Sequence, residues 1–389
     1  MSEIKVNSIK GVGASAAAIT VNNTDGTCTA NITNNLSNRR LTINGAMTIA
    51  QRGTSHGSSG YRTVDRFTFN GSGLNAAVTT SQADVASGTT PYTLGFRKSH
   101  KIVNGAQTGP DAADFIQFQT KLEAQDIANS GWNYTSSSSF ITLSFWVKAS
   151  VSQTYFGLLQ TQDGSAHNYP FSFALTADQW TKVTKTIPGN SNLTFDNNSD
   201  AGLNIRIIPF YGTQYTNNSS TVNNWVASSS TAETPDNTST WYTTSGSTFE
   251  YTGVQLEVGS VATDFEHRSF GQELALCQRY YYRLNCDQAG QRFGSGFQKT
   301  SSAAFVMIPF PTTMRSKPTA LETTGTASDY TVARTSTYEV CNVVPVFEVA
   351  TVINCNIGTN QTGASLSTGQ GVMLRANTTN FFLGFSAEL

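Results

Sequence analysis

The feature that most constrains this chain is an alternation of apolar and polar residues, which recurs in short segments from about residue 41 onward. In residues 141–148 the odd positions are apolar, and residues 171–175 and 203–207 repeat the pattern. Because successive side chains of a strand point to opposite faces, each segment predicts a strand with one buried and one solvated face. Clusters of Gly, Asn, Ser and Pro separate the segments, so the sequence favours an antiparallel β-sandwich.

The charge content excludes some classes of partner. Charged residues make up 13% of the 389 residues, and the formal net charge is -1. This share is about half of the roughly 25% in typical soluble domains, so neutral polar side chains must solvate most of the surface. No run of Lys or Arg offers a footprint for a phosphate backbone, and no apolar run approaches the length of a membrane span or a signal peptide. We therefore expect no nucleic-acid partner, no membrane insertion, and synthesis in the cytoplasm.

Two segments interrupt the regular alternation before residue 285. In residues 249–257 the apolar register switches across Thr252 and Gly253, as a β-bulge would make it. The second segment reads as a helix, because Ser269 can form a capping box with Gln272 three residues later. Its apolar stripe, which could face the core or form a seam between copies of the chain, is the candidate oligomer interface: Phe270, Leu274, Cys277 and Tyr281.

The sequence carries little that would support catalysis or metal binding. The four histidines lie far apart, and neither HExxH nor G-x-S-x-G occurs. The five cysteines are widely spread without a C-x-x-C pair, which predicts free thiols. The densest acidic cluster is better explained as a solvated loop and strand edge than as a glycosidase pair: Asp111, Asp114, Glu123 and Asp126. We expect a protein that is not an enzyme, with no cofactor and no metal site.

Aromatic residues in polar surroundings give the candidate binding site. Trp132 and Tyr134 lie in a turn-like segment, and the polar stretch 213–248 contains Trp225, Trp241 and Tyr242. Aromatic rings among Asn and Thr suit stacking on sugar rings, so these five residues are the predicted carbohydrate-binding residues. The alternative is that the rings plug the ends of the sandwich or an interface.

Several segments together resemble a known family. Residues 41–67, which include AQRGT and YRTVDRF, resemble the opening of the carbohydrate-binding-module-like jelly roll found in phage tail fibres. Residues 143–148 and 178–183 are similar to its central strands, and residues 251–281 resemble its closing signature. The resemblance covers about residues 41–283 and implies a jelly-roll fold in a phage virion protein. It brings no catalytic residues with it.

Both ends of the chain extend this resemblance. Residues 1–10 look like the N-termini of marine phage fibre proteins, where such a segment would attach the fibre to other tail or capsid proteins. Residues 1–40 hold too few large apolar side chains for a core of their own, so we expect them to order against copies or a partner. Residues 314–319 resemble a turn of a second β-sandwich that follows the helix in similar proteins.

These observations predict an all-β virion protein in four parts: an N-terminal docking segment (1–40), a jelly roll (41–267), a helical connector (268–284) and a C-terminal β-sandwich (285–389). The low-core N-terminus, the helical stripe and residues 305–310, which are apolar on both faces, favour a homotrimer. The expected function is a tail fibre or receptor-binding protein that attaches to host cell-surface glycan. The alternatives are a capsid-decorating or tail-assembly protein without glycan binding, and a depolymerase. The short repeats of a β-helix that would favour a depolymerase do not occur.

Overall fold

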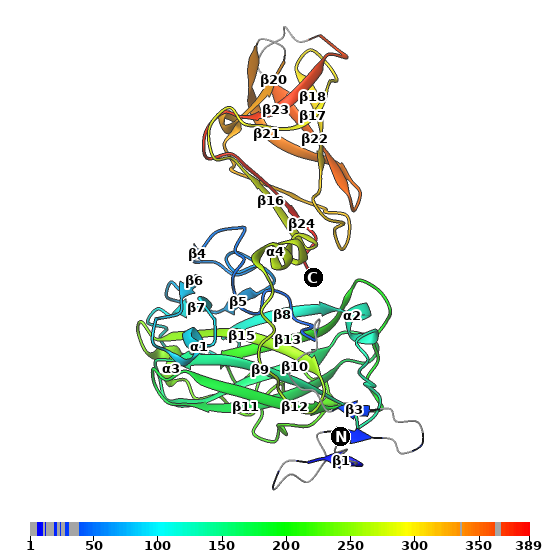
Figure 1. The fold of residues 1–389 in the computed structure, drawn as a ribbon. Helices are drawn as coiled ribbons and strands as arrows, with labels where there is room; N and C mark the ends of the chain where they lie inside the picture. The colour runs from blue at the N-terminus through cyan, green and yellow to red at the C-terminus, as the bar shows by residue number, and fades with distance from the viewer. Residues whose placement is uncertain are drawn as a thin grey trace.

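A computed structural model describes residues 6–10, 12, 19–21, 24, 28–30, 39–334, 337–361 and 367–389. Strands dominate this part of the chain, which confirms the all-β prediction (Figure 1). The α-helices within it are short: α1 (Thr90–Thr93), α2 (Ala124–Ala128), α3 (Thr240–Thr243) and α4 (Phe270–Gln278), with one 3-10 turn, η1 (Ala327–Asp329). No helix in the described residues is long and apolar enough to cross a membrane.

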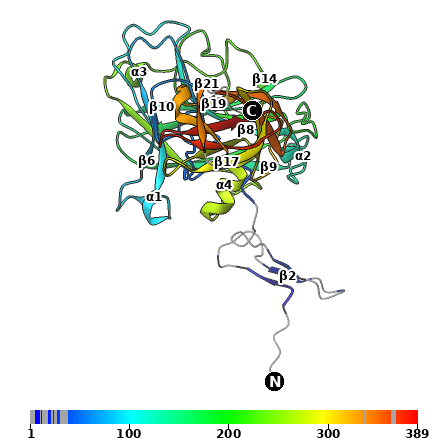
Figure 2. The ribbon, with the colours of Figure 1, turned by 90° about the horizontal axis from the view of Figure 1, so that it is seen from above.

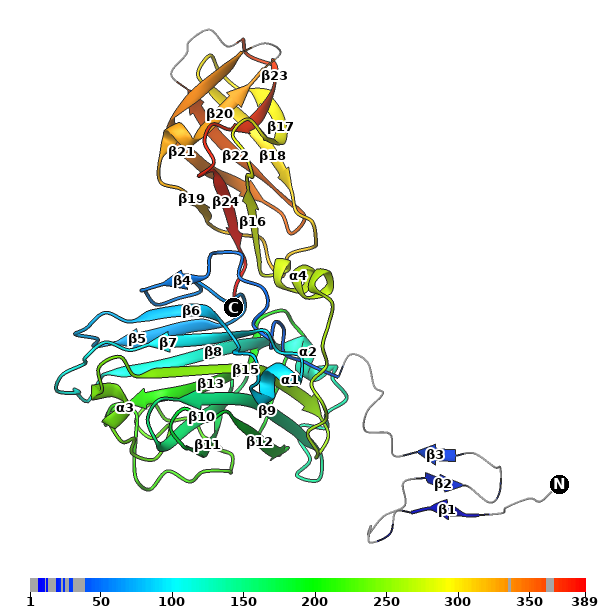
Figure 3. The same cartoon turned by 60° about the vertical axis from the view of Figure 1, so that its left-hand side comes forward.

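The described N-terminal residues form a small antiparallel sheet of three strands, β1 (Ser8–Ile9), β2 (Ile19–Val21) and β3 (Cys28–Ala30). Figures 2 and 3 show this sheet beside the larger body of the protein rather than within it. The predicted docking role of residues 1–40 falls largely on residues that lie outside the described part, and it stays a prediction.

The central part consists of two six-stranded antiparallel sheets that face each other as a sandwich. The strands of the first sheet, in spatial order, are β14 (Val226–Ala227), β11 (His167–Leu175), β10 (Gln153–Thr161), β13 (Ala201–Tyr211), β8 (Phe115–Glu123) and β5 (Thr68–Ser72). Those of the second are β12 (Thr181–Pro188), β9 (Phe140–Ala149), β15 (Thr248–Val258), β7 (Lys98–Val103), β6 (Thr79–Asp84) and β4 (Ser55–His56).

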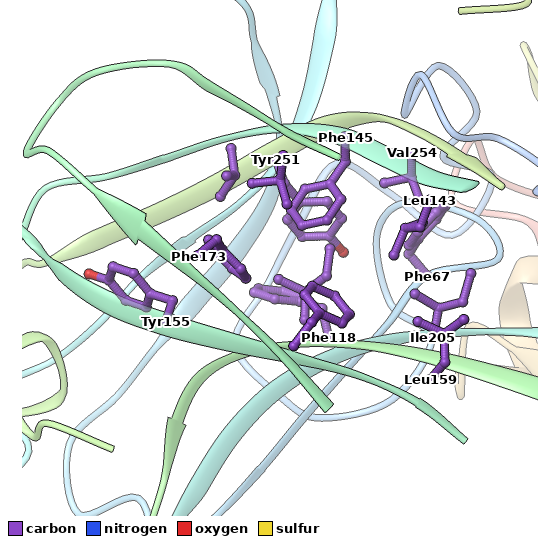
Figure 4. Packing of buried hydrophobic residues seen from close by; sticks show 14 of the residues in the cluster. Phe67, Phe118, Leu143, Phe145, Tyr155, Leu159, Phe173, Ile205, Tyr251 and Val254 are labelled. Atoms are coloured by element: carbon purple, nitrogen blue, oxygen red, sulfur yellow. The ribbon is translucent and has the colours of Figure 1, made fainter. Parts of the chain in front are cut away.

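The main hydrophobic core lies between these two sheets, as the alternation predicted. The odd-numbered Leu143 and Phe145 of β9 point inward and are buried, together with Ile205 of β13. Figure 4 shows these side chains together with Phe118 of β8, in the first sheet, and Tyr251 of β15, in the second. The two sheets are thus held together by apolar side chains that each strand contributes at every second position.

The bulge predicted at Gly253 is present and is confirmed by the strand register. The pairing of β15 with β9 shifts between Thr252 and Gln255, and Gly253 has a φ of 68°. A Cβ at this position would lie 2.7 Å from the ring of Phe96. The bulge therefore requires glycine for its backbone angle and for the close approach of that ring.

The helix predicted after the sandwich begins with the expected capping box between Ser269 and Gln272. It ends at Gln278, so Tyr281 belongs to the following strand, β16 (Tyr281–Asn285), and not to a helical stripe. Cys277 and Tyr281 are fully buried within the chain itself, which removes them from a seam between copies. Of the four predicted interface residues, Phe270 is 64% exposed and Leu274 is half-buried.

The C-terminal part is also all-β, but its strands close into a barrel instead of forming two facing sheets. The bulged strand β21 shifts register against β22 three times, and such bulges add the curvature that closure needs. In spatial order the barrel strands are β17 (Arg292–Gln298), β18 (Ala303–Pro309), β22 (Asn354–Gln361), β21 (Tyr338–Ala350), β20 (Tyr330–Ala333) and β23 (Gly371–Ala376). The C-terminal part also contains a separate sheet outside the barrel, whose strands in spatial order are β16, β24 (Phe382–Ser386) and β19 (Leu321–Thr323).

The jelly roll and the barrel meet next to α4 (Figure 3). A buried cluster of charged and aromatic side chains joins them. Glu388, near the end of the chain, forms ion pairs with Arg52 and Arg66 of the jelly roll, and all three side chains are nearly inaccessible to solvent. The guanidinium of Arg52 lies 3.3 Å from the ring centroid of Tyr281, and that of Arg66 lies 3.4 Å from the centroid of Tyr280. The AQRGT and YRTVDRF segments and the two tyrosines that follow α4 therefore build the joint between the two parts.

Two further arginines extend this joint. Arg279 donates two hydrogen bonds of 2.7 Å to the carboxylate of Glu123, which also accepts one from Tyr280. Burial would raise the pKa of Glu123, but these hydrogen bonds outweigh it and hold the pKa below its ordinary value. Arg315 of the C-terminal part donates to the backbone oxygens of Ser199 and Ala387. The two parts are thus fixed to each other by directional bonds.

Candidate functional site

The structure buries most of the predicted sugar-binding aromatics. Trp241 and Tyr242 of α3 are fully enclosed, where Trp241 donates to the backbone oxygen of Thr248 (2.9 Å) and Tyr242 stacks on Phe210 with centroids 4.2 Å apart. A ring enclosed on both faces cannot stack on a sugar. These two residues therefore plug the sandwich, which is the alternative that the sequence left open.

The other predicted aromatics also pack inward. Trp132 and Trp225 are buried, and the indole of Trp225 donates to the backbone oxygen of Pro188 (2.7 Å). Tyr134 is half-buried and packs edge-on against Phe195, with centroids 5.0 Å apart. The prediction is therefore wrong for the four buried residues, which pack into the core and leave no ring face free for a sugar: Trp132, Trp225, Trp241 and Tyr242.

A cavity of about 210 Å³ opens elsewhere, on the outer face of the second sheet. It lies over β12, β9 and the bulge of β15, and it is bounded by the segment after α1 and by the loop that leaves the sandwich. The side chains and backbone that line it are Leu94, Phe96, Ser144, Phe145, Trp146, Lys182, Gly253, Thr263, Asp264, Phe265 and His267. These residues come from the segments that carry the resemblance, together with Leu94 and Phe96.

Trp146 lies on this face, in the strand next to the edge strand β12. It is an even-numbered residue of β9, so it points away from the core that Phe145 and Val147 enter, and it remains partly exposed. The strand register places Lys182 of β12 on one side of it and Thr252 of β15 on the other. An aromatic side chain thus stands beside an exposed cation on one side, and on the other beside a buried threonine whose hydroxyl donates to the backbone oxygen of Lys98.

Three rings form one wall of the cavity. The centroids of Phe96, Phe265 and His267 lie 4.9–5.1 Å from one another. The guanidinium of Arg40 covers Phe265 at 4.8 Å, and the ring of Phe96 rests against the bulge glycine. Because each ring is held by its neighbours, the wall is formed without a ligand.

The loop on the polar side of the cavity is held by hydrogen bonds. Thr263 donates from its backbone nitrogen (2.8 Å) and its hydroxyl (2.6 Å) to the carboxylate of Glu257. The side chain of Gln255 donates to the backbone oxygen of Asp264 (3.3 Å). His267 Nε2 lies 2.9 Å from the backbone oxygen of Leu94, which can only accept, so this nitrogen carries the proton. The loop therefore joins the segment after α1 across the cavity.

A second tryptophan lies on the same face. Trp180 immediately precedes β12, and the ammonium of Lys148 lies 5.1 Å from its ring centroid. Lys148 is paired with Glu250 at 3.2 Å. Sequence reasoning missed Trp146 and Trp180 as site residues, although the pattern held a signal for Trp146. In an alternating strand, a large aromatic residue at a position where a polar residue is expected is unusual. It indicates a solvent-facing surface that binds an apolar group.

The acidic cluster considered for catalysis has structural partners. Asp114 accepts from the backbone nitrogen of Asp111 (2.8 Å) and from the hydroxyl of Tyr242 (3.1 Å), and Glu123 is paired with Arg279 in the joint. Within the described ranges, no group of three or more His, Cys, Asp or Glu could hold a metal ion. Free thiols are confirmed for the cysteines whose side chains are described: Cys277, Cys286, Cys341 and Cys355.

Comparison with known proteins gives no family: no family model and no curated protein matches the chain. Solved structures match over part of it. The enzymatically active domain of bacteriophage CBA120 tailspike protein 4 has a TM-score of 0.29 and 10% identity, with 57% of this chain and 21% of that chain covered, so this chain spans about a fifth of it.

Two smaller proteins match over nearly their whole length. A structure described as CBM4 has a TM-score of 0.29 and 14% identity over 56% of this chain and 98% of its own. The N-terminal cellulose-binding domain of Cellulomonas fimi β-1,4-glucanase C has a TM-score of 0.27 and 11% identity, over 55% and 100%. At such TM-scores the likeness says nothing about this chain's ligand.

Proposed function

We propose that this chain is a glycan-binding protein without catalytic activity, and that the cavity around Trp146 holds the sugar. The observation that supports this is the combination of a partly exposed indole with a cation and hydroxyl groups around a cavity of about 210 Å³. Sugar rings present C–H faces that pack on aromatic rings, while their hydroxyls need polar partners at the edge. Lys182, Ser144 and Thr263 supply such partners.

The size of the cavity limits what it holds. Sites for drug-sized ligands measure roughly 300–1,000 Å³, so the smaller volume here suits one or two sugar residues at the end of a glycan rather than a long segment. The ring wall and the hydrogen-bonded loop are already in place, so binding costs little ordering entropy. We expect weak single-site affinity with selectivity for a terminal sugar.

We further propose that the protein acts in a phage virion, as a tail fibre or receptor-binding protein that attaches to host cell-surface glycan. The resemblance of residues 41–283 and the separate N-terminal sheet support this role. Assembly as a homotrimer would offset weak single-site binding, because linked sites engage at a high effective concentration. Phe270, whose side chain is 64% exposed on α4, is available for contact between copies.

A binding assay on the full chain tests the glycan proposal. On a glycan array, the unmodified protein should bind, and Trp146→Ala should lower the affinity about tenfold or more, which corresponds to about 1.4 kcal/mol. Lys182→Ala provides a second variant at an exposed position, where folding is little affected. Ile353→Ala is the control, because this exposed apolar residue lies on the barrel and lines neither the cavity around Trp146 nor any other cavity described below. A protein that binds no glycan, or variants that bind as the control does, would reject the site.

The virion role has its own tests. Particles that lack this protein should adsorb poorly to host cells, and normal adsorption would exclude an attachment function. Light scattering should give three times the subunit mass of 41.8 kDa. A mass equal to one subunit at micromolar concentration would contradict the trimer.

A structural role without glycan binding is the second candidate. The buried ion pairs between the jelly roll and the barrel favour it, because they make the two parts a rigid unit suited to a capsid-decorating or tail-assembly protein. The two candidates differ in what happens to adsorption. A structural protein would bind no glycan on the array, and particles that lack it would assemble poorly.

A further inference from the structure

A groove of about 450 Å³ runs along the outer wall of the barrel, where β17, β23 and β20 lie side by side. Its floor is open because small residues occupy outward positions on neighbouring strands. Ser295 of β17 and Ala333 of β20 flank Met373 of β23, which is 45% exposed. A Cβ added at Gly371 would meet no atom within 4 Å. The groove is therefore open space that a side chain from position 371 could fill without strain.

Arginine side chains border this floor. Arg292 is exposed and forms no ion pair or side-chain hydrogen bond within the residues that the structure describes. Arg334 is oriented by Thr337, which accepts from its Nε (2.5 Å), and by Glu339 at 3.6 Å. The side chains of Arg292 and Arg334 thus border the groove, and the carboxylate of Glu339 lies near that of Arg334.

A third arginine adds to the positive charge beside the groove. Arg375 of β23 lies opposite Arg292 in the strand register. It is held in place by the ring of Tyr338, whose centroid is 4.2 Å from the guanidinium, and by the hydroxyl of Thr331. Within the part of the chain that the structure describes, Glu339 is paired with Arg334, and Arg292 and Arg375 add positive charge beside the groove, although the whole chain carries a net charge of -1.

We propose that this groove is a second binding site, which recognises the acidic groups of a carbohydrate. Guanidinium forks bind carboxylate, sulfate or phosphate oxygens in pairs of hydrogen bonds. The thioether and glycine floor between them offers an apolar surface of the kind on which a sugar ring packs. A nucleic acid is a poorer fit, because the next cation along the chain from Arg292 is Lys299, after the end of β17, and its ammonium lies over the ring of Phe305. The site is separate from the cavity around Trp146 and does not depend on the function proposed for it.

Calorimetric titration of the full chain tests this site with three oligosaccharides of similar length: one carrying sulfate esters, one carrying uronic carboxylates and one neutral. The acidic probes should bind and the neutral probe should not compete with them. Arg292→Gln and Gly371→Val should each weaken binding of the acidic probe about tenfold, the first by removing a charged fork and the second by filling the groove. Whichever acidic probe binds more tightly identifies the acidic group.

Two controls keep the outcome specific. Arg62→Gln removes the same charge from an exposed position on the jelly roll, and Lys317→Gln removes a charge from an exposed position of the C-terminal part that does not line the groove, so both should leave binding of the acidic probe unchanged. If no acidic probe binds, or if Arg62→Gln weakens binding as much as Arg292→Gln, the proposal is overturned. It is also overturned if Gly371→Val changes the mass of the particle in light scattering and not its affinity, since the groove would then be a contact between copies.

Discussion

The jelly roll and the C-terminal barrel solve the problem of burying apolar side chains differently. The jelly roll encloses one large core between two sheets, and its exposed large apolar residues are scattered singly on loops and strand ends. The barrel is smaller, and its outer wall carries many half-exposed apolar side chains, among them Phe297, Met307 and Met373. A small domain encloses a lower fraction of its surface, so the barrel depends more on contacts outside itself.

Strand β21 shows this dependence most clearly. Along this strand and just beyond its end, valines recur at every third residue, and each is 38–60% exposed: Val340, Val343, Val346, Val349 and Val352. A spacing of three would alternate between faces in a regular strand, but three register shifts against β22 interrupt the alternation. We call these five residues the valine ridge. An exposed apolar ridge of this kind is typical of an interaction surface. On the outer face of the second sheet of the jelly roll, by contrast, Trp146 lies among polar neighbours.

The largest effect is expected where the two regions meet. Glu388→Ala should lower the free energy of unfolding by about 3–5 kcal/mol, because it leaves Arg52 and Arg66 buried without their carboxylate. Scanning calorimetry should then resolve separate transitions for the jelly roll and the barrel. The control Asp84→Ala removes the exposed pair with Lys98 and should cost less than about 1 kcal/mol. A single unshifted transition in Glu388→Ala would show that the joint does not couple the two regions.

Acid should destabilise the jelly roll in a way that the barrel, which contains no histidine, does not share. Burial lowers the pKa of His100 to about 3, where the ring lies between the hydroxyls of Thr63 and Tyr251. Between these two pKa values the unfolded chain, in which the histidine has its ordinary pKa, binds a proton that the folded chain does not bind. Stability is therefore lost as the pH falls from about 6.5 to about 3, by about 1.4 kcal/mol per unit of pKa shift.

Asp65 acts in the opposite sense. Burial raises the pKa of its carboxyl to about 6, so the folded chain takes up this proton first and gains stability as the pH falls from about 6 to about 4. Denaturant titrations of His100→Gln across this range separate the two effects. The variant should lose less stability toward acid than the unmodified protein, and an unchanged slope would show that His100 is not the source.

The bulge should be the most sensitive point of the wet face of the jelly roll. Gly253→Ala should cost about 1–2 kcal/mol for its positive φ, and more because the new methyl group displaces Phe96 from the wall of the cavity. Glycan binding should weaken with it. Gly88→Ala, at a similar φ of 84° with no atom within 4 Å, separates the backbone cost from the clash. Equal losses in both variants would mean that Phe96 adapts.

The smallest effect on folding is expected on the valine ridge of the barrel. Val346→Thr should change stability by less than about 0.5 kcal/mol, because the side chain is 41% exposed. It should nevertheless weaken association between copies, as measured by the concentration dependence of the light-scattering mass. Val261→Thr makes the same change on the exit loop of the jelly roll and should not affect association. If both variants associate as the unmodified protein does, the ridge is not a contact between copies.

Local chemistry made some features predictable. The alternation in residues 141–148 placed β9 with its odd positions in the core, the register switch located the bulge at Gly253, and the spacing of Ser269 and Gln272 marked the start of α4. Each depends on neighbours within a few residues, where backbone geometry and side-chain direction are set by the sequence itself.

The binding site was not predictable in the same way. The polar surroundings of Trp225 and Trp241 indicated exposure, but the loops fold back and place both indoles inside the sandwich. Trp146 was read only as part of a strand, since the rings that wall its cavity come from segments about fifty and 120 residues away. Whether an aromatic ring is covered depends on what packs on it from elsewhere in the chain, which a local pattern does not contain.

By itself, then, the sequence determined the strands, the bulge, the capped helix and the all-β class, because hydrophobic periodicity and turn chemistry act over short distances. The tertiary structure alone decided that the C-terminal strands close into a barrel, that Glu388 returns to Arg52 and Arg66, and which tryptophans face solvent. These depend on contacts between segments separated by up to several hundred residues. Only the packed chain fixes such contacts, because their energies arise from burial and charge pairing that no single segment provides.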